Sequence, residues 1–193
     1  MLRKKIVEWI EQLNLSSEAE PKEIKILKTP LGDLSRKQTF DVSWEAESLS
    51  ILAWALKKAS LPVYDIPVDG LAIANTLGFI QEKPKTVLHS PELLDCIEIA
   101  SMCDYLSILS RYQLQFSANK SLMDFEDFFY STFGSLPLDG FDFTDNDLEV
   151  RGGSICKPTK MQRRTTLNIL KMRYRALNWL LGQHRLYSQV MAK

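Results

Sequence analysis

The longest run of regularly spaced hydrophobic positions predicts a helix between Thr159 and Gly182. Thr159 and Gln162 form an N-terminal capping box, and Gly182 suits the left-handed conformation that often ends a helix. Six positions at spacings of three and four fall on one face. They are Ile169, Leu170, Arg173, Ala176, Leu177 and Leu180. Because an unpaired charge is costly on a buried face, we expect the fold to give Arg173 a partner.

A second pattern predicts a helix from about 36 to 59. Ser35 and Gln38 form another capping box, and Pro62 is the next residue that would stop a helix. One charge, Glu47, again interrupts an apolar stripe. The stripe consists of Phe40, Trp44, Glu47, Ile51 and Trp54. Other apolar residues cover much of the remaining surface, so we expect this helix to be central.

A third long helix is predicted from 91 to about 117. Ser90, Pro91 and Glu92 combine a capping hydroxyl, a proline at the first helical position and a carboxylate at the positive end of the helix dipole. Shorter patterns predict peripheral helices. They cover residues 2–13, the stretch from Pro21 to a turn at Thr29, residues 69–77, and a segment from Ser121 to Gly134 that is rich in phenylalanine.

Residues 136–157 break the helical pattern. Gly152 and Gly153 lie between short apolar runs, which indicates at most a small β-hairpin near 147–157. The predicted fold class is therefore all-α. We expect residues 1–193 to form one mostly helical domain with three long core helices, shorter peripheral helices and a C-terminal tail at 182–193.

The charge composition favours no class of charged partner, so any such binding would depend on a local patch. The chain has 193 residues, of which 45% are hydrophobic, and it has 24 basic and 24 acidic residues. It therefore has no overall field to attract nucleic acid or an anionic membrane. The segments from 1 to 13 alternate charged and apolar residues, unlike a secretory signal, and no apolar run approaches the ~20 residues of a membrane span. We expect no membrane partner and a cytoplasmic location.

Cysteine usage agrees with that location. The three cysteines are Cys96, Cys103 and Cys156, and an odd number cannot pair completely. Cys96 and Cys103 are seven positions apart on a predicted helix, roughly 10 Å along its axis, which is too far for a disulfide. We expect reduced, buried thiols, as in a reducing compartment.

Three segments carry a family resemblance. DVSWEAESLSILAWALKKASLP at 41–62, YRALNWLLG at 174–182 and the turn Cys156-Lys157-Pro158 resemble signatures of the bacterial domain-of-unknown-function family 4272. The likeness runs from about Val7 to Gly182, with Cys156 where the family pattern has glycine. The resemblance implies a mostly helical domain and assigns no activity.

Glu47 and Arg173 are the sharpest candidate site. Each is a single charge on an apolar stripe, each lies in a segment that resembles a family signature, and their signs are opposite. They could form a buried ion pair that fixes how two helices pack. Alternatively, Arg173 could stack on a tryptophan or extend outward, or the two residues could be a catalytic acid and a substrate-binding arginine. A solvent-open polar cavity beside them would favour an enzyme, whereas a dry contact would favour a binding module.

Tryptophans and a basic helix face are weaker candidates. Trp44, Trp54 and Trp179, with Trp9, could line a pocket, but apolar helical positions favour core packing. Four basic residues at spacings of four, seven and four could bind phosphate groups. They are Lys160, Arg164, Lys171 and Arg175. An acidic loop precedes them and could neutralise them, so nucleic-acid binding is the less favoured interpretation. Its residues are Asp139, Asp142, Asp145, Asp147 and Glu149.

No motif indicates a metal, a cofactor or a catalytic residue. Asp145 and Asp147 lack the glycine and closing glutamate of a calcium-binding loop. His89 and His184 have no cysteine or carboxylate at ligand spacing. A glycine-rich phosphate loop and a nucleophile elbow are also missing from the sequence. We assign no metal, no cofactor and no catalytic residue, and leave enzymatic activity open.

The leading functional hypothesis is a non-enzymatic module that binds another protein or acts as an accessory component. The alternatives are a small-molecule-binding protein or enzyme at Glu47 and Arg173, and weak nucleic-acid binding through the basic face. The identity of the partner and the oligomeric state are open.

Overall fold

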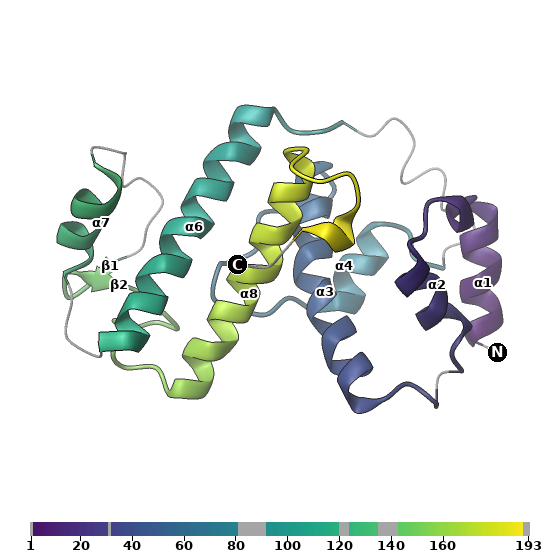
Figure 1. Cartoon of the computed structure of the whole chain (residues 1–193), viewed down its shortest axis with the longest axis horizontal. Coiled ribbons are helices and arrows are strands. Elements are labelled where there is room, and N and C mark those ends of the chain that lie inside the picture. Colours follow the sequence, from purple (N-terminus) through teal and green to yellow (C-terminus); the bar gives the residue numbers. More distant parts are fainter. Residues whose placement is uncertain (1, 31, 81–91, 120–123, 135–142, 191–193) are drawn as a thin grey trace.

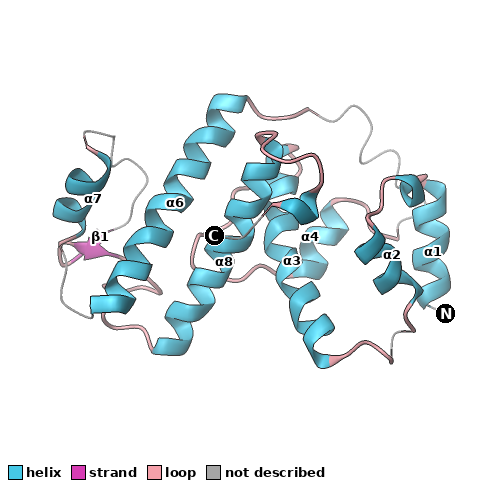
Figure 2. Cartoon of the chain, in the orientation of Figure 1, coloured by secondary structure: helices cyan, strands magenta, loops and turns pink. Residues whose placement is uncertain are grey.

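Three long helices form the core of the computed structural model (Figures 1 and 2). They are α3 (Arg36–Ala55), α6 (Cys96–Asn119) and α8 (Lys160–Leu180). α8 lies between α3 and α6 and packs against both, so the predicted all-α fold class is confirmed. The structure describes residues 2–30, 32–80, 92–119, 124–134 and 143–190.

The ends of α3 and α8 follow their local signals. The capping boxes at Ser35 and Thr159 are both formed, as predicted. Gly182 has φ +75° and follows the last turn of α8. α3 ends at Ala55 rather than near 59, because Lys57 adopts a left-handed conformation with φ 56° that stops the helix.

The predicted start of the third long helix is wrong. Residues 92–95 are not helical, and the Asp95 carboxylate accepts the Ile97 N–H at 2.7 Å, so α6 begins at Cys96. The Leu94 N–H donates instead to the carbonyl of Ala55 at 2.8 Å, which ties this segment to the end of α3. The predicted cap at Ser90 and Pro91 lies outside the described residues.

Short helices lie on the side of α3 away from α8 (Figure 1). They are α1 (Leu2–Gln12), η1 (Leu15–Ser17), α2 (Pro21–Lys28) and α4 (Gly70–Thr76). α4 packs directly on α3, where a Cβ atom at Gly70 would meet the Ala46 Cβ at 2.9 Å. The Trp9 indole N–H donates to the Gly78 carbonyl at 3.0 Å and its ring packs edge-on against Phe79, which fixes α1 near the end of α4.

The far side of α6 carries α7 (Phe125–Phe133) and a small antiparallel sheet of β1 (Phe143–Thr144) and β2 (Asp147–Leu148). Asp145 and Asn146 both have positive φ and make the two-residue turn. A small hairpin was predicted, but its paired strands precede the glycines. Gly152 instead belongs to a second reversal, closed by an isolated bridge between Glu149 and Ser154. Asp124 caps α7, and Ser121, the predicted start, lies outside the described residues.

Buried apolar residues of α3, α6, α7 and α8 and of the segment around β2 form one cluster. Cys103 belongs to it, whereas Cys96 and Cys156 are exposed, so the prediction of buried thiols is wrong for those two. Among the helices that the structure describes, none combines the length and apolar character needed to cross a membrane.

Candidate functional site

Glu47 of α3 and Arg173 of α8 meet in the interior. Arg173 Nη2 lies 2.8 Å and Nε 3.0 Å from Glu47 Oε2. The two side chains are 1% and 4% exposed, so the ion pair is dry. Burial lowers the pKa of Arg173, an effect that the neighbouring Glu47 carboxylate opposes.

The guanidinium also binds the loop between α3 and α4. Nη1 donates to the carbonyl oxygens of Pro62 at 3.1 Å and Val63 at 2.7 Å, and Nη2 donates to that of Ile66 at 3.1 Å. With the two bonds to Glu47, all five N–H donors of Arg173 are satisfied. This explains how a charged side chain can lie on the apolar stripe of α8, because none of its donors is buried without an acceptor.

Glu47 completes the enclosure. Its Oε1 atom accepts the Val68 N–H at 2.9 Å, so the ion pair contacts the loop from Pro62 to Val68 at both ends. Losing one partner of such a pair typically costs about 3–5 kcal/mol, because the remaining charge is stranded. The pair therefore ties the backbone of this loop to α3 and α8.

The same loop holds the hairpin region. The Tyr64 hydroxyl donates to the Glu149 carbonyl, and the Asp65 carboxylate accepts the Arg151 N–H. Tyr64 and Asp65 are both buried. We call residues 61–68 the anchored loop, since its backbone and buried side chains join α3, α8 and the segment around β2.

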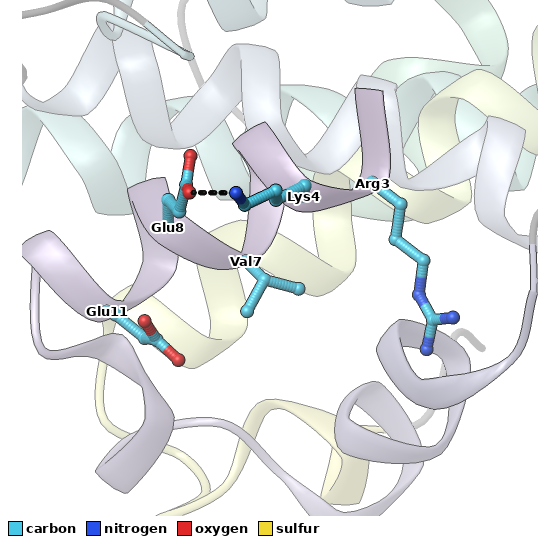
Figure 3. A pocket seen from close by; sticks show the side chains of 5 residues that line it. All are labelled: Arg3, Lys4, Val7, Glu8 and Glu11. Atoms are coloured by element: carbon cyan, nitrogen blue, oxygen red, sulfur yellow. Dashed lines mark ion pairs between the residues drawn. The ribbon is translucent and has the colours of Figure 1, made fainter. Parts of the chain in front are cut away.

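Two open hollows lie elsewhere. One, of about 590 Å³, lies on α1; Figure 3 shows its Lys4–Glu8 ion pair and Arg3, whose guanidinium donates to the Lys28 carbonyl. It is lined by Arg3, Lys4, Val7, Glu8 and Glu11. The other, of about 490 Å³, lies where α7 faces α6. Neither is lined by Glu47 or Arg173, and the mixed charges of the first give it no net preference for an ionic ligand.

A second glutamate–arginine pair lies two residues away on each helix. Arg175 Nη1 donates to Glu45 Oε1 at 3.1 Å, and the two side chains are 15% and 41% exposed. Tyr187 covers this pair. The C-terminal segment folds back from the end of α8 to bring it there (yellow in Figure 1). The sequence pattern had placed Arg175 in a basic stripe and had assigned no role to Tyr187.

Tyr187 is half-buried and contacts several side chains of α3 and α8. The Arg175 guanidinium lies 4.0 Å from its ring centroid and donates to its carbonyl at 3.1 Å. Trp179 packs edge-on at 6.0 Å between ring centroids. The hydroxyl lies 2.6 Å from Ser48 Oγ and 3.0 Å from Glu45 Oε2. Burial raises the pKa of Tyr187, so the phenol stays protonated and can donate.

The tryptophans do not gather into one pocket. Trp54 packs against the core cluster, and Trp179 contacts Tyr187. Trp44 packs edge-on against Phe40 at 6.0 Å, and its buried indole N–H has no hydrogen-bond partner among the described residues. Neither of the two hollows is lined by a tryptophan.

The basic stripe is divided by the fold. Lys160 and Arg164 are exposed and Lys171 is half-buried, whereas Arg175 is engaged by Glu45 and Tyr187. The acidic loop does not neutralise the stripe within the described part of the chain, where its ion pair joins Asp145 to Lys157 at 3.5 Å. Asp139 and Asp142 lie outside that part.

Among the described residues of the acidic loop, Asp147 is buried. Asp147 accepts a hydrogen bond from the Tyr112 hydroxyl, and burial raises the pKa of Asp147. In the stretches of chain that the structure describes, no three histidine, cysteine, aspartate or glutamate side chains gather in a group that could hold a metal ion. Asp147 is therefore part of the packing between α6 and β2.

Comparison with known proteins gives one result. A family model described as "Domain of unknown function (DUF4272)" matches residues 1–124 of the 193, so the chain belongs to this family. The predicted family is thereby confirmed. The segment Tyr174–Gly182, which also suggested it, lies outside the matched residues. No curated protein and no solved structure matches the chain.

Proposed function

We propose that this member of the DUF4272 family is a non-enzymatic module that binds another protein through the anchored loop. The observation that carries the proposal is the fixed backbone at residues 62–68. Three of its carbonyls accept hydrogen bonds from Arg173, and this backbone leaves Val63 58% and Ile66 50% exposed. The loop therefore presents apolar side chains on a backbone that is already ordered.

The energetics favour recognition by this loop. Burying a side chain such as Val63 or Ile66 contributes about 1.5–3 kcal/mol. Ordering a mobile loop on binding would offset part of that gain, but Arg173 and Glu47 already hold this one. Leu61, the first residue of the anchored loop, and Leu71, in the first turn of α4, are also exposed. The surface thus combines apolar area with a preformed shape.

The alternative functions have less support. An enzyme or ligand site at Glu47 and Arg173 would need a free donor or an opening, whereas all five donors of Arg173 are used inside the protein. Binding of nucleic acid through the basic stripe would have to do without Arg175, which is held by Glu45 and Tyr187. For the compartment, the unpaired cysteines support the cytoplasm.

A retention experiment tests the proposal. The tagged chain, a Val63→Ser/Ile66→Ser variant and a Met161→Ser control are each exposed to lysate of the organism that encodes the protein. Met161 is also exposed but lies at the start of α8. We expect a protein retained by the chain and by the control, and reduced about tenfold or more by the loop variant, since two lost apolar contacts amount to a few kcal/mol. Equal retention by all three folded proteins would contradict the proposal.

A further inference from the structure

The C-terminal segment fills a slot on α3 and α8 that is built around a tyrosine. We call this the tyrosine slot and define it by Glu45, Ser48, Arg175 and Trp179, with Glu20 at its rim. The geometry points to a peptide-binding site for a short segment of a partner protein that carries an unmodified tyrosine at the start of a helical turn, as Tyr187 starts the 3-10 turn η2 (Tyr187–Gln189). The chain's own Tyr187 occupies the slot in cis.

The slot contacts the ring, the hydroxyl and the backbone carbonyl of Tyr187, which any tyrosine in a peptide also has. Arg175 stacks on the ring and donates to the tyrosine carbonyl, while Glu45 and Ser48 meet the hydroxyl. Glu20 Oε1 accepts the N–H of the next residue, Ser188, at 3.0 Å. These contacts use the tyrosine itself and the residue after it, whose backbone N–H and side chain both hydrogen-bond Glu20.

Charge sets the specificity of the slot. Glu45 faces the tyrosine hydroxyl, and Glu20 faces the backbone of the following residue. A phosphate on the ring would lie against the Glu45 carboxylate and replace the donated proton with negative charge. A proline after the tyrosine would remove the N–H that Glu20 accepts. The slot therefore selects a tyrosine that is unphosphorylated and is not followed by proline.

The resident segment can be displaced. It follows α8 and Gly182, and Glu45 is 41% exposed, so the slot borders solvent. Arg175 Nε is buried without a hydrogen-bond partner among the described residues, which leaves the resident complex incompletely satisfied. A tethered ligand has a high effective concentration, so an external peptide must compete with Tyr187. The resident tail is thus an autoinhibitory occupant.

The test uses the full chain with the slot emptied. A fluorescent peptide with the sequence of residues 182–190, GQHRLYSQV, is titrated against wild type, Tyr187→Ala and Tyr130→Ala, and its anisotropy is followed. Tyr130 is an exposed tyrosine on α7 and serves as the matched control. We expect Tyr187→Ala to bind the peptide about tenfold or more tightly than wild type, because the tethered competitor is removed. Tyr130→Ala should behave as wild type.

Peptide variants and a broken slot complete the experiment. Phosphotyrosine, or proline in place of the serine after tyrosine, should each weaken binding to Tyr187→Ala about tenfold. Adding Arg175→Met to Tyr187→Ala should abolish it. Equal binding to wild type and Tyr187→Ala, or no binding to a folded Tyr187→Ala chain, would overturn the inference. A wild-type dimer that Tyr187→Ala converts to a monomer would also overturn the cis assignment, because the tail would then fill a second copy.

The inference is independent of the anchored loop. A Val63→Ser/Ile66→Ser/Tyr187→Ala chain should bind the peptide as Tyr187→Ala does, since these side chains do not contact the slot. Loss of retention through the loop and loss of peptide binding through the slot can therefore be told apart.

Discussion

Helices α3 and α8 carry two glutamate–arginine pairs that differ in their surroundings. The two glutamates are two residues apart on α3, and the two arginines are two residues apart on α8. Glu47 and Arg173 are sealed in the interior, whereas Glu45 and Arg175 lie at the surface under the C-terminal segment. The residue types and the spacing are the same in both pairs.

The difference shows that the acceptors around an arginine decide its role. Arg173 donates to three backbone carbonyls besides Glu47, and these carbonyls belong to one loop. Arg175 donates to one carbonyl, that of Tyr187, and stacks on the same residue. Arg173 therefore fixes the backbone of a loop, whereas Arg175 holds the side chain of Tyr187, which we propose can be displaced.

The largest expected effect comes from removing both arginines together. A chain that ends at residue 124, where the family match stops, lacks α8 and hence both pairs. Because α8 lies between α3 and α6, their apolar faces would be exposed to water. We expect loss of the whole stability of the fold, about 5–15 kcal/mol for a typical domain. Circular dichroism should show no cooperative melting, in contrast to residues 1–193.

The next prediction concerns the sealed pair alone. Arg173→Met should cost about 3–5 kcal/mol, because Glu47 and the carbonyls of Pro62, Val63 and Ile66 lose their donor. At about 2–4 °C per kcal/mol for a chain of this size, the melting temperature should fall by roughly 10 °C. Differential scanning calorimetry measures the change.

A paired variant gives the control for that prediction. Glu47→Gln/Arg173→Met leaves no stranded charge, so it should be destabilised by less than the sum of the two single variants. If Glu47→Gln and Arg173→Met each melted at the wild-type temperature, the structural role of the pair would be wrong.

The open pair should respond more weakly. Arg175→Met removes a partly exposed ion pair and a cation–π contact, which together contribute about 1 kcal/mol. The melting temperature should fall by about 3 °C. Release of the C-terminal segment should be easier to detect than the change in melting temperature, because trypsin should cleave after Arg185 faster than in wild type. Arg164→Met, an exposed position on α8, should leave both measurements unchanged.

Acid should loosen the tail. Hydrogen bonds from Ser188 hold the pKa of Glu20 below its ordinary value of 4.5. A carboxyl group with a lowered pKa in the folded state stabilises it above the ordinary pKa, and this contribution is lost as pH falls from there through the lowered value. The NMR signal of the Ser188 amide should therefore shift below about pH 4.5 in wild type. A Glu20→Gln chain that showed the same shift would refute this.

The sequence pattern predicted helix starts correctly where a local capping signal stood beside a long periodic run and no contact with a distant segment interfered. The capping boxes at Ser35 and Thr159 each sit beside a long periodic run, and both helices begin as predicted. The start of α6 was missed because Leu94 pairs with Ala55, a contact between distant segments, and Asp95 then serves as the cap. The reversal around Gly152 and Gly153 was predicted and is closed by the bridge between Glu149 and Ser154, but the strand pair that turns at Asp145 and Asn146 was missed because that turn contains no glycine.

The two glutamate–arginine pairs also show what the sequence pattern can and cannot predict about a site. A lone charge on an apolar stripe singled out Glu47 and Arg173, since a buried charge leaves a visible break in periodicity. The backbone carbonyls that surround Arg173 carry no such signal, because carbonyl direction in a loop does not depend on a repeating side-chain pattern. Arg175 looked like a surface residue, and only the folded-back position of Tyr187 reveals its role.

Arg173 holds the anchored loop mainly through main-chain oxygens, and every amino acid supplies one. The side chains that point outward, Val63 and Ile66 among them, can therefore be exchanged during evolution without disturbing the attachment. Family members that keep the glutamate and arginine should show the same loop path while displaying different chemistry on it. The side chains exposed on the anchored loop would then differ among family members, while the path of its backbone stays the same.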